Sequence, residues 1–211
     1  AMAVELAPAG IRVVALNPVA GETPLLKTFM GEDTPEMRAK FLSTIPIGRF
    51  CQPRAEIEVA FVLGRRLEGP GVTIADVMRA TDYVLPSIEI VDSRVADWKI
   101  KIQDTIADNA SSAALVLGGR PTRLHDIDPA LIGATLRKNG EIVETGCSGA
   151  VLGNPAIAVA WLANKVAQFG VALEPGHVIM PGSCTRMIPV VAGDHVRADF
   201  DGLGHVAVRF V

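Results

Sequence analysis

The chain has 211 residues, of which 49% are apolar, 20% are charged and only 5% are aromatic. This composition supports a packed core of mainly aliphatic side chains, and it excludes a disordered chain. The net charge is −3, from 20 basic and 23 acidic residues without a basic block, so nucleic acid is not an expected partner. At this length we expect one domain, or one domain with a small appendage.

Two further features bear on the compartment. The longest apolar stretch, residues 156–163, is too short to cross a bilayer, and no charged-then-apolar leader opens the sequence. The cysteines, Cys51, Cys147 and Cys184, are odd in number and widely spaced, which favours reduced thiols. We therefore expect a cytoplasmic protein without a membrane partner.

The first fifty residues alternate between helix and strand signals. Residues 1–6 favour a helix that ends at residues 8–10, and residues 11–16 form a β-branched run typical of a buried strand. Thr34 precedes a proline, which predicts a helix that Thr34 caps and that extends over residues 35–42. This part is predicted as helix–strand–helix.

From residue 54 onward, strands with frequent glycine turns replace this alternation, so we place a domain boundary between residues 53 and 54. Asn139-Gly140 is the strongest hairpin signal in the chain. Residues 155–169 predict a helix that Gly170 ends. Strands are predicted over residues 55–63, 84–91, 131–137, 178–180, 195–200 and 205–210.

Two glutamates alternate along the first of these strands. Residues two apart share one face of a strand, so Glu56 and Glu58 point the same way while Ile57 and Val59 pack behind them. Such close carboxylates repel each other unless one is protonated or a cation lies between them. Glu89, in another predicted strand, offers a third oxygen ligand, and this set suits Mg²⁺ or Mn²⁺. The solvated face of an antiparallel sheet explains the same spacing without a metal.

Two polar loops are further candidates. Residues 104–112 gather small hydroxyl and amide groups, as a loop that binds an oxyanion would, or as an ordinary capped turn does. Residues 181–185 offer backbone N–H groups and hydroxyls, either as a carboxylate cradle or as a plain turn. The histidines share no metal-ligand spacing, and the sequence has no glycine-rich phosphate loop, so we expect no NAD site.

Five motifs occur in order along most of the chain. They are residues 52–61 (QPRAEIEVAF), 88–94 (IEIVDSR), 97–112 (DWKIKIQDTIADNASS), 149–155 (GAVLGNP) and 159–165 (VAWLANK). Together they resemble the 2-hydroxypenta-2,4-dienoate (2-keto-4-pentenoate) hydratases, which belong with the 4-oxalocrotonate decarboxylases in the fumarylacetoacetate hydrolase superfamily. The resemblance implies an α/β (α+β) fold in which a mixed β-roll surrounds the site.

The same resemblance implies a site and a reaction. Glu56, Glu58 and Glu89 would bind Mg²⁺ or Mn²⁺, Ser111 would be a catalytic residue that binds the substrate together with Asn109, and Ser183 would hold the substrate carboxylate. The implied activity is that of a hydro-lyase: hydration of 2-hydroxypenta-2,4-dienoate to 4-hydroxy-2-oxopentanoate in aromatic-compound catabolism, by a homo-oligomer. The alternative within the family is decarboxylation of 4-oxalocrotonate.

Residues 1 to about 50 instead resemble the C-terminal part of a short-chain dehydrogenase/reductase, on the segments within residues 1–24, which makes the whole resemble a chimera. The predicted parts are a reductase-like fragment, 1–53, and a hydratase-like metal-binding domain, 54–211. In the hydratases, the region before the paired glutamates supplies a substrate-facing lysine, and neither Lys27 nor Lys40 matches its motif. We therefore expect weak or absent turnover. An inactive chimeric scaffold or interaction protein is the alternative of another class.

Overall fold

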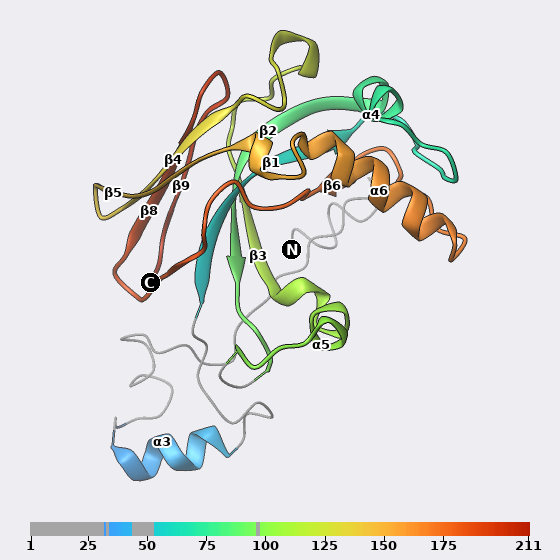
Figure 1. Cartoon of the computed structure of the whole chain (residues 1–211). Helices are drawn as coiled ribbons and strands as arrows, with labels where there is room; N and C mark the ends of the chain where they lie inside the picture. Colours follow the sequence, from blue (N-terminus) through green and yellow to red (C-terminus); the bar gives the residue numbers. More distant parts are fainter. Residues whose placement is uncertain (1–31, 33, 44–52, 96–97) are drawn as a thin grey trace, which may run out of the picture.

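The computed structural model describes residues 32, 34–43, 53–95 and 98–211. From residue 53 onward, these residues form two β-sheets with helices beside them (Figure 1). The helix predicted over 1–6 and the strand predicted over 11–16 lie outside the described residues. The helix predicted after Thr34 is α3, Pro35–Leu42. The Met37 N–H donates to Thr34 Oγ1 at 3.2 Å, so the predicted cap is confirmed.

The first sheet carries the acidic residues. Its centre is the long antiparallel pair β1 (Arg54–Leu63) and β2 (Thr81–Val91). β3 (Ser112–Leu117) extends the sheet beyond β2, while β6 (Val178–Ile179) and β7 (Ile188–Pro189) pair with the other side of β1. Within this sheet, β1 is therefore bordered on both sides.

The second sheet has the order β5-β4-β8-β9. Asn139 and Gly140 adopt φ values of 54° and 91° between β4 and β5, which confirms the predicted hairpin turn. All pairs of described strands are antiparallel, so this part of the roll consists of curled antiparallel sheets where the resemblance implies a mixed one. The strands are β4 (Gly133–Lys138), β5 (Glu141–Cys147), β8 (His195–Phe200) and β9 (Gly204–Arg209).

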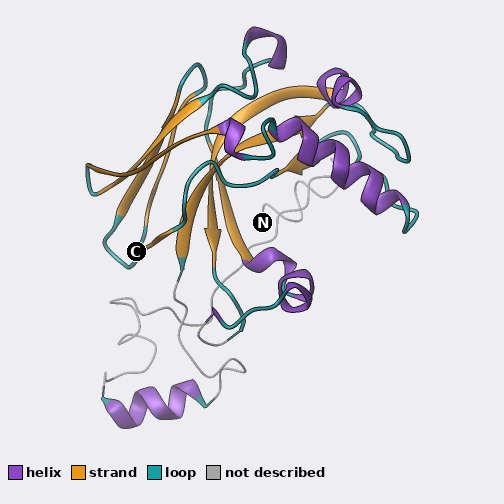
Figure 2. Cartoon of the chain, viewed as in Figure 1, coloured by secondary structure: helices purple, strands orange, loops and turns teal. Residues whose placement is uncertain are grey.

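Figure 2 shows the helices around the sheets. Asn154 caps α6 (Pro155–Ala167) by accepting from the Ala156 N–H at 2.9 Å, and this helix ends two residues before the predicted end. The helices α4 (Ile74–Ala80) and α5 (Ile102–Ala107) and the strand β3 were not predicted. Short 3₁₀ helices cover Asn109–Ser111, Leu124–Asp126 and Ser148–Ala150. No helix in the described ranges is long and apolar enough to span a membrane.

The aliphatic core lies behind the acidic face of β1. Ile57, Val59 and Phe61 are at most 1% exposed and belong to one cluster with side chains from β4, β8, α4 and α6. Full burial of each such side chain contributes about 1.5–3 kcal/mol. Packing of this face fixes the orientation of β1 and turns Glu56 and Glu58 to the opposite face, as the alternation predicts.

Gly146 in β5 fixes the position of the segment next to the acidic residues. A Cβ at Gly146 would lie 2.0 Å from the carbonyl oxygen of Cys184, a backbone atom that no rotamer change can move. The Cys184 N–H in turn donates to the Ile57 carbonyl at 2.8 Å. The backbone at Cys184 is therefore packed between β5 and β1.

Gly146→Ala is therefore expected to destabilise the protein by about 2–4 kcal/mol, because the backbone must shift to admit the methyl group. Thermal denaturation with and without Mg²⁺ measures this effect. Gly133→Ala in the neighbouring strand is the matched control, since a Cβ there meets nothing within 4 Å. If the two variants melt at the same temperature, the close approach is not as described.

Candidate metal centre

Three glutamates meet on one face of the β1–β2 pair. Glu56 lies directly opposite Glu89 in the register, and Glu58 lies two residues further along β1. The carboxylates offer oxygen atoms that all lie within 4.8 Å of one another, and they form the one cluster of this kind among the residues that the structure describes. The predicted convergence of the three side chains is confirmed.

The protein supports Glu58 from two sides. The Gly182 N–H donates to Glu58 Oε2 at 2.8 Å, and the Ser87 hydroxyl donates to the Glu58 carbonyl at 2.7 Å. Glu58 is only 2% exposed, while Glu56 and Glu89 are half-buried. This burial argues against the solvated sheet face that the spacing alone also allowed. Sequence reasoning offered the N–H groups of residues 181–185 as a carboxylate cradle, but it did not identify Glu58 as the carboxylate that Gly182 binds. It missed Ser87, whose contact with Glu58 depends on the strand register.

Burial raises the pKa of two of these carboxyl groups. The pKa of Glu56 rises to about 7 through burial and the charge of Glu89, against a hydrogen bond from Ser183 that lowers it. The pKa of Glu58 rises to about 8 through burial and the neighbouring glutamates, against the hydrogen bond from Gly182. The cluster therefore retains protons near neutral pH, and a cation that displaces them would relieve the repulsion.

The donor set fits a hard divalent cation. Three carboxylates without a histidine or thiolate are the ligands that Mg²⁺, Mn²⁺ or Ca²⁺ takes, with water or substrate oxygens completing the shell. Cys184 is buried nearby, and burial with the charge of Glu58 raises the pKa of its thiol to about 12. The thiol stays protonated at neutral pH, which makes it unsuited as a ligand or nucleophile.

The loop predicted to bind the substrate has an unusual backbone. Asn109, Ala110 and Ser111 have φ values of 56°, 58° and 59°, so three successive non-glycine residues are left-handed. Each such residue costs roughly 1–3 kcal/mol and persists only where the surroundings impose it. Ser111 is 1% exposed and donates to Asp108 Oδ2 at 2.8 Å, whereas Asn109 is exposed. The Asp92 N–H donates to the Ser111 carbonyl at 2.9 Å, just beyond the strand that carries Glu89.

Arg94 and Asp108 hold this left-handed segment. Arg94 Nε lies 3.3 Å from Asp108 Oδ1, and Arg94 Nη2 donates to the Ser112 carbonyl at 3.0 Å. Asp108 also accepts from the Arg94 N–H at 3.0 Å. The pair therefore connects the end of β2 to the start of β3.

Arg94→Gln should therefore loosen residues 109–112, because the amide cannot span Asp108 and the Ser112 carbonyl together. We expect a loss of stability of about 1–3 kcal/mol and at least about tenfold faster amide exchange at Asp92 and Ser112. Hydrogen-exchange mass spectrometry measures this, with Arg79→Gln on α4 as the control. If amide exchange at Asp92 and Ser112 is unchanged in Arg94→Gln, Arg94 does not hold the left-handed segment in place.

The remaining predicted residue lies beside the cluster. Ser183 donates to the Thr185 carbonyl at 2.7 Å, and its hydroxyl lies close enough to Glu56 to lower the pKa of that carboxyl. The segment 181–185 is thus more than a plain turn, because it supplies contacts to both glutamates of β1. The nearby Thr185 hydroxyl is buried without a hydrogen-bond partner, alone in this among the described side chains.

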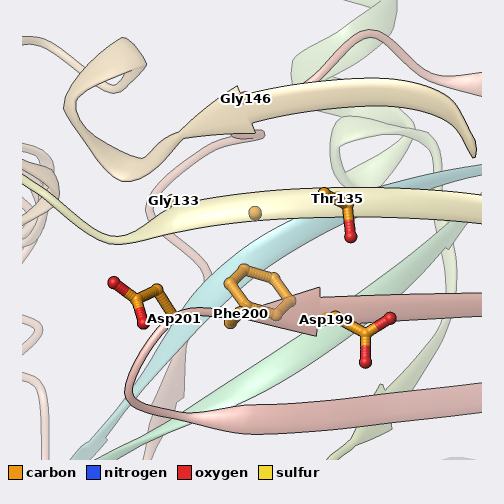
Figure 3. Close-up of a pocket in the computed structure, with 7 residues that line it drawn as sticks. Gly133, Thr135, Gly146, Asp199, Phe200 and Asp201 are labelled. Carbon is orange, nitrogen blue, oxygen red and sulfur yellow. The ribbon is translucent and has the colours of Figure 1, made fainter.

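A hollow of about 480 Å³ lies elsewhere, on the second sheet (Figure 3). None of the three glutamates lines it. Asp199 at its wall is already bound by Arg197, with Nη2 to Oδ1 at 2.6 Å. The lining residues are Gly133, Ala134, Thr135, Gly146, Asp199, Phe200 and Asp201. This hollow is therefore separate from the candidate metal centre.

Curated relatives with this sequence pattern are hydratases. The chain is 48% identical over 159 residues to the 2-hydroxyhexa-2,4-dienoate hydratase of Comamonas testosteroni. The aligned region covers 75% of this chain and 60% of that protein. It is 45% identical over 175 residues to the 2-oxo-hept-4-ene-1,7-dioate hydratase of Escherichia coli. Here the aligned region covers 80% of this chain and 66% of that protein. The chain thus spans less than two thirds of the length of these relatives.

A solved structure has the same fold. The 4-oxalocrotonate decarboxylase of Pseudomonas putida G7, complexed with calcium and acetate, superposes with a TM-score of 0.72 at 40% identity, over 78% of this chain and 61% of that one. A complex of the same enzyme with magnesium and adipate gives a TM-score of 0.75 at 32% identity, over 100% of this chain and 82% of that one.

The sequence profile described as fumarylacetoacetate (FAA) hydrolase C-terminal matches residues 23–211. This match includes residues 23–53 of the predicted reductase-like fragment, so the comparisons do not show a reductase origin for the N-terminal part. The fragment 1–53 and the boundary at 53/54 stay predictions. Over most of its length, the chain belongs to the fumarylacetoacetate hydrolase family, with the 2-keto-4-pentenoate hydratases among its relatives.

Proposed function

We propose that the chain hydrates short 2-hydroxy-2,4-dienoates of the 2-hydroxypenta-2,4-dienoate type to 4-hydroxy-2-oxo acids, with Mg²⁺ or Mn²⁺ as cofactor. The observation that carries the proposal is the cluster of Glu56, Glu58 and Glu89 within 4.8 Å, in a chain whose relatives are named hydratases. The calcium and magnesium complexes of the decarboxylase support a divalent cation. A cytoplasmic homo-oligomer in aromatic-compound catabolism belongs to the same proposal.

In this proposal the glutamates bind the cation, and the neighbouring polar groups orient the substrate. A divalent cation held by the glutamates would stabilise the negative charge that develops on the substrate's C2 oxygen during proton transfer and addition of water. Gly182 fixes one oxygen of Glu58, which leaves the other free to face the cation. We assign the orientation of the substrate carboxylate and the dienol to Ser183 and to the loop of Asn109 and Ser111. The Ser183 and Ser111 hydroxyls donate to the Thr185 carbonyl and to Asp108 in this structure, so each would turn away from that partner to bind the substrate.

Decarboxylation of 4-oxalocrotonate is the second candidate, and the structural similarity to that decarboxylase favours it specifically. Both reactions place negative charge on the same C2 oxygen, so the glutamate cluster serves either. The two reactions differ in their products, because only decarboxylation releases CO₂.

The test is the Mg²⁺-dependent loss of dienol absorbance on addition of 2-hydroxypenta-2,4-dienoate, with the products identified by mass spectrometry. Slow hydration that EDTA abolishes supports the proposal. Release of CO₂ from 4-oxalocrotonate without hydration of the dienoate would favour the decarboxylase. No turnover of either substrate, with Mg²⁺ bound, would favour the inactive scaffold.

A further inference from the structure

The connection between β6 and β7, residues 180–187, supplies contacts to the strand that carries Glu58. The Gly182 N–H donates to Glu58 Oε2 at 2.8 Å, and the Cys184 N–H donates to the Ile57 carbonyl at 2.8 Å. Residues 180–187 contain neither a helix nor a strand. The position of this connection, and with it the hydrogen bond to Glu58, therefore depends on what the connection packs against.

An ion pair with the second sheet holds the connection four residues beyond Gly182. Arg186 Nη2 lies 2.9 Å from Glu144 Oε1, and Arg186 Nε donates to Glu144 Oε2 at 3.5 Å. Each carboxylate oxygen thus meets its own donor, the forked geometry in which an arginine–carboxylate pair is strongest. The Arg186 side chain is 87% exposed and that of Glu144 only 16%, so the arginine neutralises a carboxylate that the fold has largely removed from water.

Glu144 acts on the connection from the same side as Gly146. The two residues lie two apart in β5, and residues two apart share one face of a strand. Gly146 packs against the Cys184 carbonyl, and Glu144 pairs with Arg186 two residues later. Residues 184–186 are therefore held against β5 by a close backbone contact at one end and by an ion pair at the other.

We infer that Glu144 and Arg186 are positioning residues of the metal centre, because their ion pair keeps the connection where the Gly182 N–H fixes one oxygen of Glu58. This inference rests on the cation of the proposed function and not on its reaction. Loss of a group that orients a metal ligand typically lowers metal affinity by about 10–100-fold. The Glu144–Arg186 pair acts one step further out and is exposed on one side, so we expect roughly 3–10-fold.

The charges of the two residues alone predict a different result. If only their fields reached the cation, loss of the positive Arg186 would strengthen Mg²⁺ binding and loss of the negative Glu144 would weaken it. Positioning predicts that loss of either residue weakens Mg²⁺ binding. It also predicts that the double variant binds Mg²⁺ no more weakly than Arg186→Gln, since both changes remove the same interaction.

Two measurements on the full chain test the inference: calorimetric titration of EDTA-stripped protein with Mg²⁺, and amide exchange at Gly182 by NMR in EDTA. Arg186→Gln and Glu144→Gln should each weaken Mg²⁺ binding roughly 3–10-fold and speed exchange of the Gly182 amide by a similar factor. Arg186→Lys should lie between Arg186→Gln and wild type, because the ammonium keeps the charge but cannot form the fork.

Lys138→Gln is the control for a general loss of stability. Lys138 Nζ donates to the Pro189 carbonyl at 2.9 Å and lies 2.8 Å from Asp194 Oδ2, so it holds the chain beyond the connection. The variant should lower the melting temperature, because the buried Asp194 loses its cationic partner. Its Mg²⁺ affinity and its Gly182 exchange should stay within about twofold of wild type.

Three results would overturn the inference. They are unchanged Mg²⁺ affinity and Gly182 exchange in both variants, stronger Mg²⁺ binding by Arg186→Gln, and an equal loss of Mg²⁺ affinity in Lys138→Gln. If Arg186→Gln does not fold, Glu144→Gln decides, since it keeps the size of the side chain.

The same data separate the inference from the proposed function. If wild type binds no Mg²⁺, the proposed function fails, and exchange of the Gly182 amide still decides whether Glu144 and Arg186 position this segment. If wild type binds Mg²⁺ but does not turn over the dienoate, the proposed reaction alone is refuted.

Discussion

Glu58→Gln is expected to lower Mg²⁺ affinity by at least about 100-fold, since it removes a buried charged ligand while keeping the shape of the side chain. The amide oxygen can still accept from the Gly182 N–H, so the local backbone stays in place. Isothermal titration calorimetry on EDTA-stripped protein measures the effect. Glu68→Gln, at a glutamate that is exposed and paired with Arg66, is the control and should bind Mg²⁺ as wild type does.

The stability of the same variant separates loss of a ligand from loss of the fold. Burial raises the pKa of Glu58 to about 8, so ionising this carboxyl destabilises the metal-free protein. In EDTA, Glu58→Gln should therefore melt no lower than wild type at pH 8. If Glu58→Gln binds Mg²⁺ as tightly as wild type, Glu58 is not a metal ligand. If its melting temperature falls far below that of wild type, Glu58 is needed for the stability of the folded protein.

Mg²⁺ affinity is expected to rise roughly 10²–10³-fold between pH 6 and pH 8. The pKa values of Glu56 and Glu58 are about 7 and 8, so at pH 6 both carboxyls are largely protonated and a cation must displace two protons. At pH 8, fewer protons have to leave. Titration in buffers of different ionisation enthalpy counts the protons released. A pH-independent affinity with no proton release would contradict the raised pKa values.

The metal-free protein should show the opposite dependence. Both folded-state pKa values lie above the ordinary value of 4.5, so the folded state binds more protons than the unfolded state between these values. The contribution to stability is fully present below about pH 4.5 and is lost as the pH rises toward 8. In EDTA, the Glu56–Glu58 contribution should therefore lower the melting temperature as the pH increases, and Mg²⁺ should restore stability most strongly at pH 8.

The elements that sequence reasoning found are those with strong local signals. The strand of Ile57, Val59 and Phe61 alternates clearly, and Asn139-Gly140 has the left-handed conformation that its turn requires. The helix α4 was missed although Thr73 and Asp76 form a capping box, because only seven residues follow the cap. β3 was missed because its hydrogen-bonding partner is β2, which no local pattern reveals.

The site was predictable to a similar extent. Spacing placed Glu56 and Glu58 on one face, and a second predicted strand offered Glu89 as a third oxygen ligand, but only the strand register brings Glu89 opposite Glu56. The Gly182 N–H on Glu58 joins residues 124 positions apart, a distance that sequence periodicity cannot bridge. The left-handed backbone at Ser111 was also unpredicted, because its cause is the contact between Arg94 and Asp108.

The central claim is that Glu56, Glu58 and Glu89 together bind one divalent cation. A crystal structure of the Mn²⁺-soaked protein, with anomalous scattering recorded at the manganese edge, tests it most directly. The account predicts a single strong anomalous peak with one oxygen of each glutamate at about 2.1–2.2 Å. A peak elsewhere, or no peak at these residues in crystals whose manganese content is established, would contradict it.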